Sequence, residues 1–242
     1  MTTQLSGPVL VAGQGLYETS STQNHVLGAY AETADGRGFR YAKVGAVSTV
    51  PGKLYQASAQ DTTNLNPSGG ISVSAAAIGA TSVTLTSSLT LAANLLQGGF
   101  LGVNVTPGQG YMYRITSNTA VSGAANCVVT LEDPIAVALT TSSKVVLTQN
   151  PYNGIIVNPA TASSSPVGVA QYIITNGQFG WIQTFGPALL LNDSGTAVGL
   201  GLAPSAATAG SVKTMAATLA QVGYALQVGV TTEYDFVFLT IH

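Results

Sequence analysis

Short runs in which apolar and polar residues alternate dominate residues 71–150. In TSVTLT, Val83 and Leu85 alternate with serine and threonine, a pattern typical of a strand with one buried and one solvated face. Turn-forming residues separate the runs at a spacing of about ten residues, as in β-sandwiches and β-barrels. We therefore predict an all-β body of short antiparallel strands, which include ISVSAA, TSVTLTSS, GFLGVNV, GYMYRIT, CVVTLED and KVVLTQ.

The stretch VGVAQYIITNGQFGWIQTFGPALL, residues 167–190, shows the clearest alternation and contains no charged residue. Its Asn176-Gly177 pair predicts a β-hairpin with a two-residue type I′ loop, because that loop needs positive φ at both central positions. With this loop, Tyr172 lies opposite Trp181 and Ile174 lies opposite Phe179. We expect the face that carries these four side chains to be core. The alternative is a contact surface for another subunit, where aromatic residues are also enriched.

The C-terminal run YDFVFLTI alternates Tyr234, Phe236 and Phe238 with Asp235, Val237 and Leu239. Both faces are apolar beyond Asp235, so we expect a strand covered on one side by the core. On its other side we expect another layer or a partner. Upstream, SVKTMAATLAQVG (211–223) has apolar residues at helical spacing. Its Gly, Thr and Ser neighbours weigh against a helix there, and both readings stay open.

Charged residues cluster near the N-terminus, where Glu18, Glu32, Asp35, Arg37, Arg40, Lys43 and Lys53 fall within residues 18–53. We interpret residues 1–57 as an extended N-terminal arm that ends in a short strand, GFRYAKVG. A β-rich domain, 58–150, follows and begins with a turn-rich connector at 58–70. A second β-rich half, 151–242, begins with another turn-rich connector at 151–166 and completes the body.

Charged residues make up 7% of the 242 residues, against about 25% in ordinary globular proteins. Low surface charge favours association, so we expect much of the surface to contact protein, including further copies of the chain. Seven Lys and Arg residues make no basic stripe for nucleic acid. The sequence shows no signal peptide and no apolar run long enough to cross a membrane, so we expect no membrane partner.

No catalytic pattern stands out, and we predict a protein that is not an enzyme and needs no cofactor or metal. One cysteine, Cys127, and two histidines cannot provide a zinc site, and the single cysteine excludes an intrachain disulfide. A glycosidase pair or a Ca²⁺ site would need convergent carboxylates. Nothing in the sequence marks such a pair among Glu18, Glu32, Asp35, Asp61, Glu132, Asp133, Asp193, Glu233 and Asp235.

The segment ADGRGFR combines Asp35, Arg37 and Arg40 around a glycine-rich turn. In a chain with so few charges, a local cluster of both signs is a candidate for orienting an interface. The alternative is a solvated hairpin tip. We predict that the interface residues of the arm are Tyr17, Tyr30, Arg37, Phe39, Arg40 and Tyr41.

Several segments together resemble a family of tailed-phage virion structural proteins. They are GRGFRYAKVGA, GKLYQ, GATSVTLT, LEDPIAVAL, NPY and VGVAQYIITNGQFGWIQTFGPA, within a resemblance that spans roughly residues 28–240. The resemblance implies a capsid decoration, or cement, protein: a β-rich homotrimer that binds the major capsid protein on the outer surface of the head. Its motifs consist of glycines, aromatics and turns, so they imply no active site.

Three other roles remain open on the sequence. A phage tail fibre or receptor-binding module would present exposed aromatics to carbohydrate, for which Tyr111, Tyr113 and Trp181 are the candidates. A hydrolase of cell-wall polymers would need two carboxylates facing a groove. A major capsid protein is disfavoured, because by resemblance the common phage capsid fold implies a longer chain and a long helix.

Overall fold

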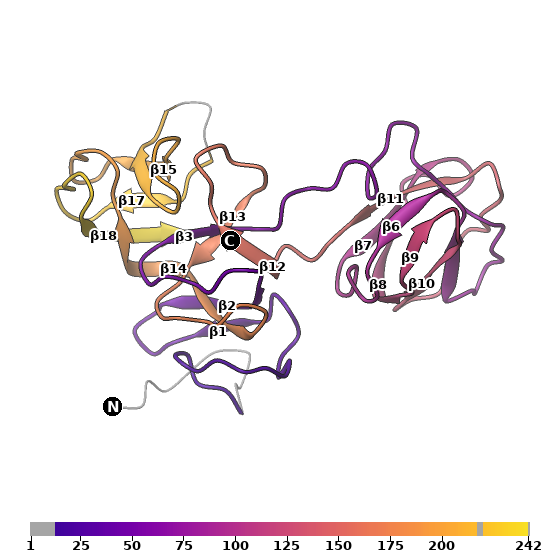
Figure 1. Ribbon diagram of the computed structural model, residues 1–242, viewed down its shortest axis with the longest axis horizontal. Coiled ribbons are helices and arrows are strands. Elements are labelled where there is room, and N and C mark those ends of the chain that lie inside the picture. The colour runs from indigo at the N-terminus through magenta and orange to yellow at the C-terminus, as the bar shows by residue number, and fades with distance from the viewer. Residues whose placement is uncertain (1–12, 217–219, 242) are drawn as a thin grey trace. The chain divides into compact units, whose positions relative to one another are not determined.

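The computed structural model describes residues 13–216 and 220–241, and within these ranges the protein is all-β (Figure 1). This confirms the predicted fold class. The chain divides into two compact units. We call residues 60–150 the inserted unit, and the described parts of Met1–Ala59 and Pro151–His242 together the composite unit.

The inserted unit is a small β-barrel. Its six-stranded sheet has the order β4 (Ile71–Ser72), β11 (Lys144–Thr148), β7 (Phe100–Val105), β8 (Met112–Asn118), β10 (Cys127–Leu131) and β5 (Ser82–Leu85). A bridge from Val73, next to β4, to Leu85 of β5 closes the ring. A separate two-stranded sheet pairs β6 (Leu89–Leu91) with β9 (Val121–Gly123).

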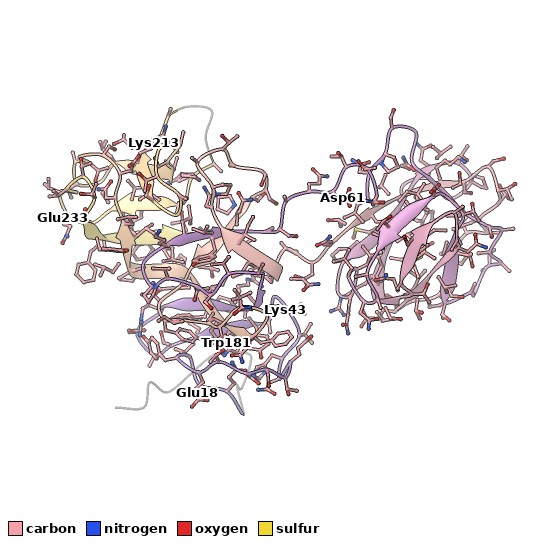
Figure 2. The ribbon with its side chains drawn as sticks, in the orientation of Figure 1. Glu18, Lys43, Asp61, Trp181, Lys213 and Glu233 are labelled. Carbon is pink, nitrogen blue, oxygen red and sulfur yellow. The ribbon has the colours of Figure 1, made fainter. Side chains whose placement is uncertain are left out.

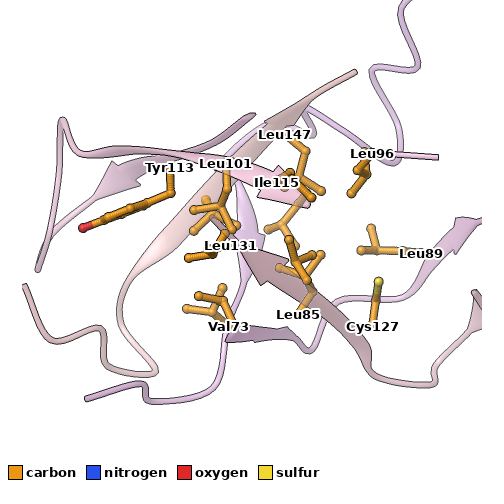
Figure 3. Packing of buried hydrophobic residues seen from close by; sticks show 14 of the residues in the cluster. Val73, Leu85, Leu89, Leu96, Leu101, Tyr113, Ile115, Cys127, Leu131 and Leu147 are labelled. Atoms are coloured by element: carbon orange, nitrogen blue, oxygen red, sulfur yellow. The ribbon is translucent and has the colours of Figure 1, made fainter. Parts of the chain in front are cut away.

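The alternating residues of these strands fill one continuous core (Figure 3). Val83 and Leu85 are buried in it, as the alternation predicts. Cys127 is fully buried there, and burial raises the pKa of its thiol, so the thiolate that would act as a nucleophile is disfavoured.

The composite unit contains one ten-stranded sheet. Its order is β1 (Tyr30–Glu32), β2 (Gly38–Val44), β12 (Asn153–Val157), β3 (Leu54–Gln56), β13 (Pro166–Val169), β14 (Phe179–Leu191), β18 (Tyr234–Thr240), β17 (Gly223–Ala225), β15 (Gly201–Pro204) and β16 (Val212–Thr214). Strand β14 is much the longest, with 13 residues.

Strand β14 belongs to two closed rings. Its first half, from Phe179 to Phe185, pairs with β2 and closes the ring β2-β12-β3-β13-β14. Its second half pairs with β18, and a bridge between Asn192 and Val212 links its end to β16. This second link closes the ring β14-β18-β17-β15-β16. Each ring encloses a hydrophobic cluster of its own, so β14 connects two small cores.

The residues interpreted as an N-terminal arm do not form a separate element. Strands β1, β2 and β3 all lie in the ten-stranded sheet, and β2 contacts both β12 and β14. Residues 1–12 of the expected arm lie outside the described residues. The sheet of the half expected to begin at residue 151 therefore includes strands from residues 30–56. It includes no strand of the domain expected at 58–150.

The turn at Asn176-Gly177 forms, but the predicted hairpin does not. The Gln178 amide donates to the Thr175 carbonyl at 3.0 Å, and Gly177 alone of the two central residues has positive φ, as in a type II turn. Trp181 pairs with Tyr41 of β2 rather than with Tyr172. Strands β13 and β14 do pair antiparallel, but only at Val169 and Gln183, because β13 ends at Val169. The residues of β14 from Phe179 to Phe185 pair with β2.

The helical reading of residues 211–223 is also wrong, as far as the structure describes that segment. Val212–Thr214 form β16, and Gly223 begins β17. Backbone pairing explains the difference: Pro204 of β15 pairs with Val212, and the Asp193 amide donates to the Val212 carbonyl at 2.9 Å. The strand conformation at Val212 therefore links β15 to the residues that follow β14, and a helix there would lose both pairings.

Residues 13–25 form a strap across the start of β14. Gln14 is buried at its centre: its side-chain amide donates to the carbonyls of Glu18 and Phe179, while its oxygen accepts from the Tyr41 hydroxyl at 2.7 Å and from Asn24 at 3.0 Å. Leu16 of the strap shares one hydrophobic cluster with Phe39, Tyr41, Phe179 and Trp181.

His25 ends the strap against two aromatic rings. Its ring centroid lies 5.1 Å from that of Tyr41 and 5.3 Å from that of Trp181. Among the described residues, neither His25 Nε2 nor Trp181 Nε1 has a hydrogen-bond partner, and both atoms are buried. Burial lowers the pKa of His25 below its ordinary value, because the surrounding rings cannot solvate the charged imidazolium.

We therefore expect the composite unit to lose stability as the pH falls through the lowered pKa of His25. The stabilisation is complete above the pKa of a histidine in the unfolded chain, about 6.5, where both states are neutral. Urea unfolding at a series of pH values from about 7.5 to 5.5 measures the loss, with a His25→Phe variant as control. An equally steep decline in that variant would assign the effect to other groups.

Candidate interaction surface

The outer side of β14 and β18 carries large apolar side chains that the chain leaves exposed. Along β18, Val237 and Leu239 point into the second ring, whereas Tyr234 and Phe236 remain 42% and 51% exposed. Leu189 of β14 lies directly opposite Phe236 in the register and is also exposed. The alternation predicted both faces correctly as apolar, and the fold covers only the inner one.

Aromatic contacts extend this surface along the sheet. The Phe238 ring stacks on Tyr224 of β17, with ring centroids 5.1 Å apart, and meets the edge of Phe185 at 5.2 Å. Leu226, which follows β17, donates its backbone amide to the Phe236 carbonyl. We define the apolar face by these neighbouring residues, which are Phe185, Pro187, Leu189, Tyr224, Leu226, Tyr234, Phe236 and Phe238.

The residues of the apolar face carry no charge, and the nearby Arg37, which packs against Gly186, is paired with Asp35. Residues 185–216 and 220–241 hold four charged residues: Asp193, Lys213, Glu233 and Asp235. Hydrogen bonds from Ser205 and Thr208 lower the pKa of Asp193. Asp235 is buried and accepts hydrogen bonds of its own. Lys213 and Glu233 are therefore the two charged residues of these ranges whose charged groups form no internal hydrogen bond (Figure 2).

Hydrogen bonds to Asp235 hold the loop between β17 and β18 in place. This loop borders the apolar face. Its carboxylate accepts from the Val230 amide at 2.9 Å and from the side-chain amides of Asn192 and Gln227, each at 3.2 Å. Gly229 packs directly on Asn192, where an added Cβ would overlap the Asn192 side-chain nitrogen at 1.8 Å. The loop is thus held by a buried polar network and a close backbone approach.

Replacing Asp235 with alanine is expected to cost about 1–3 kcal/mol, because buried amide donors would lose their acceptor. Asp235→Asn should cost less, since the amide keeps one oxygen as an acceptor. Glu233→Ala is the matched control, because it removes a nearby exposed carboxylate and should change stability by less than about 0.5 kcal/mol. Equal losses in the free energy of unfolding for Asp235→Ala and Glu233→Ala would contradict the role of the network.

The six predicted interface residues do not share one surface. Tyr17 is exposed, and its hydroxyl lies 3.4 Å from a nitrogen of Arg37, which also forms an ion pair with Asp35. Phe39 and Tyr41 are core residues, because their side chains pack beneath the strap. They are therefore unavailable to a partner of the folded unit.

Tyr30 and Arg40 form a local structural contact. The Arg40 guanidinium lies over the rings of Tyr30 and Tyr152, at 5.3 and 5.9 Å from their centroids, and donates to the Gly28 carbonyl at 2.8 Å. This arrangement links β2 to Gly28, which lies between the strap and β1, and to Tyr152, which precedes β12. Tyr17 is exposed and Tyr30, Arg37 and Arg40 are partly exposed, so these four predicted residues remain candidates for a contact.

The aromatics proposed for carbohydrate binding are also dispersed. Tyr111 is exposed in the inserted unit, but Tyr113 beside it is buried, and Trp181 is fully buried in the composite unit. One exposed ring provides no platform of the kind that the tail-module alternative requires.

The described residues show no grouping typical of metal binding or of acid–base catalysis. Within them, no cluster of three or more His, Cys, Asp and Glu side chains could hold a metal ion. The Glu132 carboxylate pairs with Arg114 at 2.7 Å on the surface of the inserted unit. In the same ranges, no helix has the length and apolar character needed to span a membrane.

No known protein family, curated protein or solved structure matches this chain. Within the described residues, the apolar face groups several exposed aromatic and aliphatic side chains on adjacent strands.

Proposed function

We propose that this protein is a non-enzymatic decoration, or cement, protein of a tailed-phage head. In this role it binds the major capsid protein on the outer capsid surface as an oligomer and stabilises the head. The observation that carries the proposal is the apolar face, a row of exposed aromatic and aliphatic side chains with no charge among them, which supports assembly of the chain into the oligomer. The motif resemblance to virion structural proteins supplies the biological setting.

The physical basis of the role is contact area rather than chemistry. Removing apolar surface from water contributes about 25 cal/mol per Å², so exposed aromatics on a fixed sheet give a partner a favourable place to pack. A decoration protein binds a lattice that repeats the same contact many times. Modest individual contacts then add up through multivalency, without any bond-making step.

The closed rings suit this role. A sheet closed on itself has few free edges, which limits unspecific strand pairing at high local concentration. Both units are closed in this way within the described residues, by the Val73–Leu85 and Asn192–Val212 bridges and by the pairing of β2 with β14. Specific contacts are then left to side chains on the outer faces of the sheets.

Copy number in purified virions tests the proposal. Quantitative mass spectrometry compares peptides of this chain with those of the major capsid protein. A ratio of order one supports decoration of the head, and removal of the gene should then lower the resistance of the heads to heat. A few copies per hundred capsid subunits would instead favour a tail component, and absence from virions would overturn both roles.

A further inference from the structure

We propose that the apolar face packs against a second copy of this chain. The inference goes beyond the proposed function, because it concerns the purified protein by itself. It assigns the interface to the outer side of β14, β17 and β18, rather than to the N-terminal residues that the sequence suggested.

The exposed area is of the size expected for the centre of an interface. A fully exposed aromatic side chain presents about 150–250 Å², so the half-exposed Tyr234 and Phe236 together present on the order of 200 Å². Leu189 and Leu226 add aliphatic surface next to them. Exposed apolar patches of a few hundred Å² mark interaction sites, and a stable interface buries about 800 Å² per partner.

The chemistry of the face favours its own copy over an unrelated partner. Surfaces that meet different proteins commonly use complementary charge to steer and orient the partner, and the apolar face has no charged side chain. For the same reason two copies of the face do not repel each other. Interfaces between identical subunits are also the more apolar class, which matches a face of leucine, proline, phenylalanine and tyrosine.

A two-fold axis at the centre of the apolar face would place the same residues on both sides of the interface. β14 and β18 are antiparallel, and the Leu189–Phe236 pair sits between Phe238 on one side and Tyr234 on the other. In an interface that uses the same patch on both subunits, residue i contacts residue j while j contacts i. The aromatic ring of Phe236 would then meet the aliphatic Leu189 of the other copy, twice per interface.

The experiment compares the mass in solution of the purified full chain and two variants over a wide range of concentration, by analytical ultracentrifugation. Phe236→Asp places a carboxylate at the centre of the apolar face. Ile173→Asp is the matched control, because Ile173 is exposed in the same unit and lies outside the face. We expect the wild type and Ile173→Asp to form the same oligomer and Phe236→Asp to sediment as a chain of 24.4 kDa.

A wild type that stays monomeric at every concentration would overturn the inference, as would a Phe236→Asp variant that assembles like the wild type. Circular dichroism and urea unfolding establish that each variant is folded. Leu189→Asp provides a second variant at the same place if Phe236→Asp does not fold. A monomeric wild type that still occupies heads would reject this interface and the oligomer but leave the decoration of the head standing. An oligomer absent from virions would support the interface and reject the decoration.

Discussion

Replacing Trp181 with alanine is expected to destabilise the composite unit by about 3–5 kcal/mol, the range found when a large aromatic is removed from a core. Trp181 is fully buried, and its ring contacts Tyr41 edge-on with centroids 5.1 Å apart. Its backbone amide donates to the Tyr172 hydroxyl at 3.0 Å. The residue therefore joins β14, β2 and the segment before β14, and alanine would leave a cavity among them.

Calorimetry and urea unfolding followed by circular dichroism measure this loss, because removal of the single tryptophan abolishes its fluorescence signal. The core of the inserted unit shares no residue with the cluster around Trp181, so its unfolding transition should be unchanged. Leu101→Ala, in that other core, is the complementary control and should affect the inserted unit alone. If each variant lowered both transitions equally, the division into two cores would be wrong.

Replacing Gln14 with alanine should cost about 1–3 kcal/mol, although the residue is polar and lies near the chain start. The substitution would leave the buried Tyr41 hydroxyl without the oxygen to which it donates, while the Phe179 carbonyl keeps the Ser20 amide as a donor. Each buried group left unsatisfied costs about 1–3 kcal/mol. Loosening the strap would also expose the aromatic cluster beneath it, which includes Leu16 and Trp181.

Gln23→Ala is the matched control, because Gln23 is exposed and bonds locally to the His25 carbonyl. Limited proteolysis of the strap and the free energy of unfolding should separate the two variants. Similar values for both would mean that the strap contributes little. A variant that lacks residues 1–25 would also lose the contacts of Gln14. Weaker capsid binding by that variant would therefore indicate loss of folding, unless the composite unit were shown to be intact.

Local pattern was sufficient to predict the strands of the inserted unit. In segments such as TSVTLT, burial alternates with the residue type, although the partner strand β10 lies far along the chain, with Val83 paired to Val129. Within such a strand the side-chain period alone decides which residues enter the core. The turn at Asn176-Gly177 was predictable for the same reason, because its hydrogen bond involves residues that are three positions apart.

Pairing between distant segments was not predictable from the pattern. Strand β2 is more than 130 residues from β14 in the sequence, yet Tyr41 pairs with Trp181. A prediction that considers nearest neighbours assigns Trp181 to a hairpin with Tyr172 and interprets Phe39 and Tyr41 as surface anchors. The long β14 offers two edges over its length, and which strands occupy them depends on the closure of both rings.

For the candidate interaction surface too, some properties could be predicted from the sequence and others could not. The sequence by itself determined that YDFVFLTI is apolar on both faces and that very little charge lies near it, because alternation and composition are properties of the residues alone. Only the tertiary structure decided that the second ring covers Val237 and Leu239 and leaves Tyr234 and Phe236 exposed. A ring of short strands encloses one face of each strand, so the direction in which the sheet closes selects the face that remains for a partner.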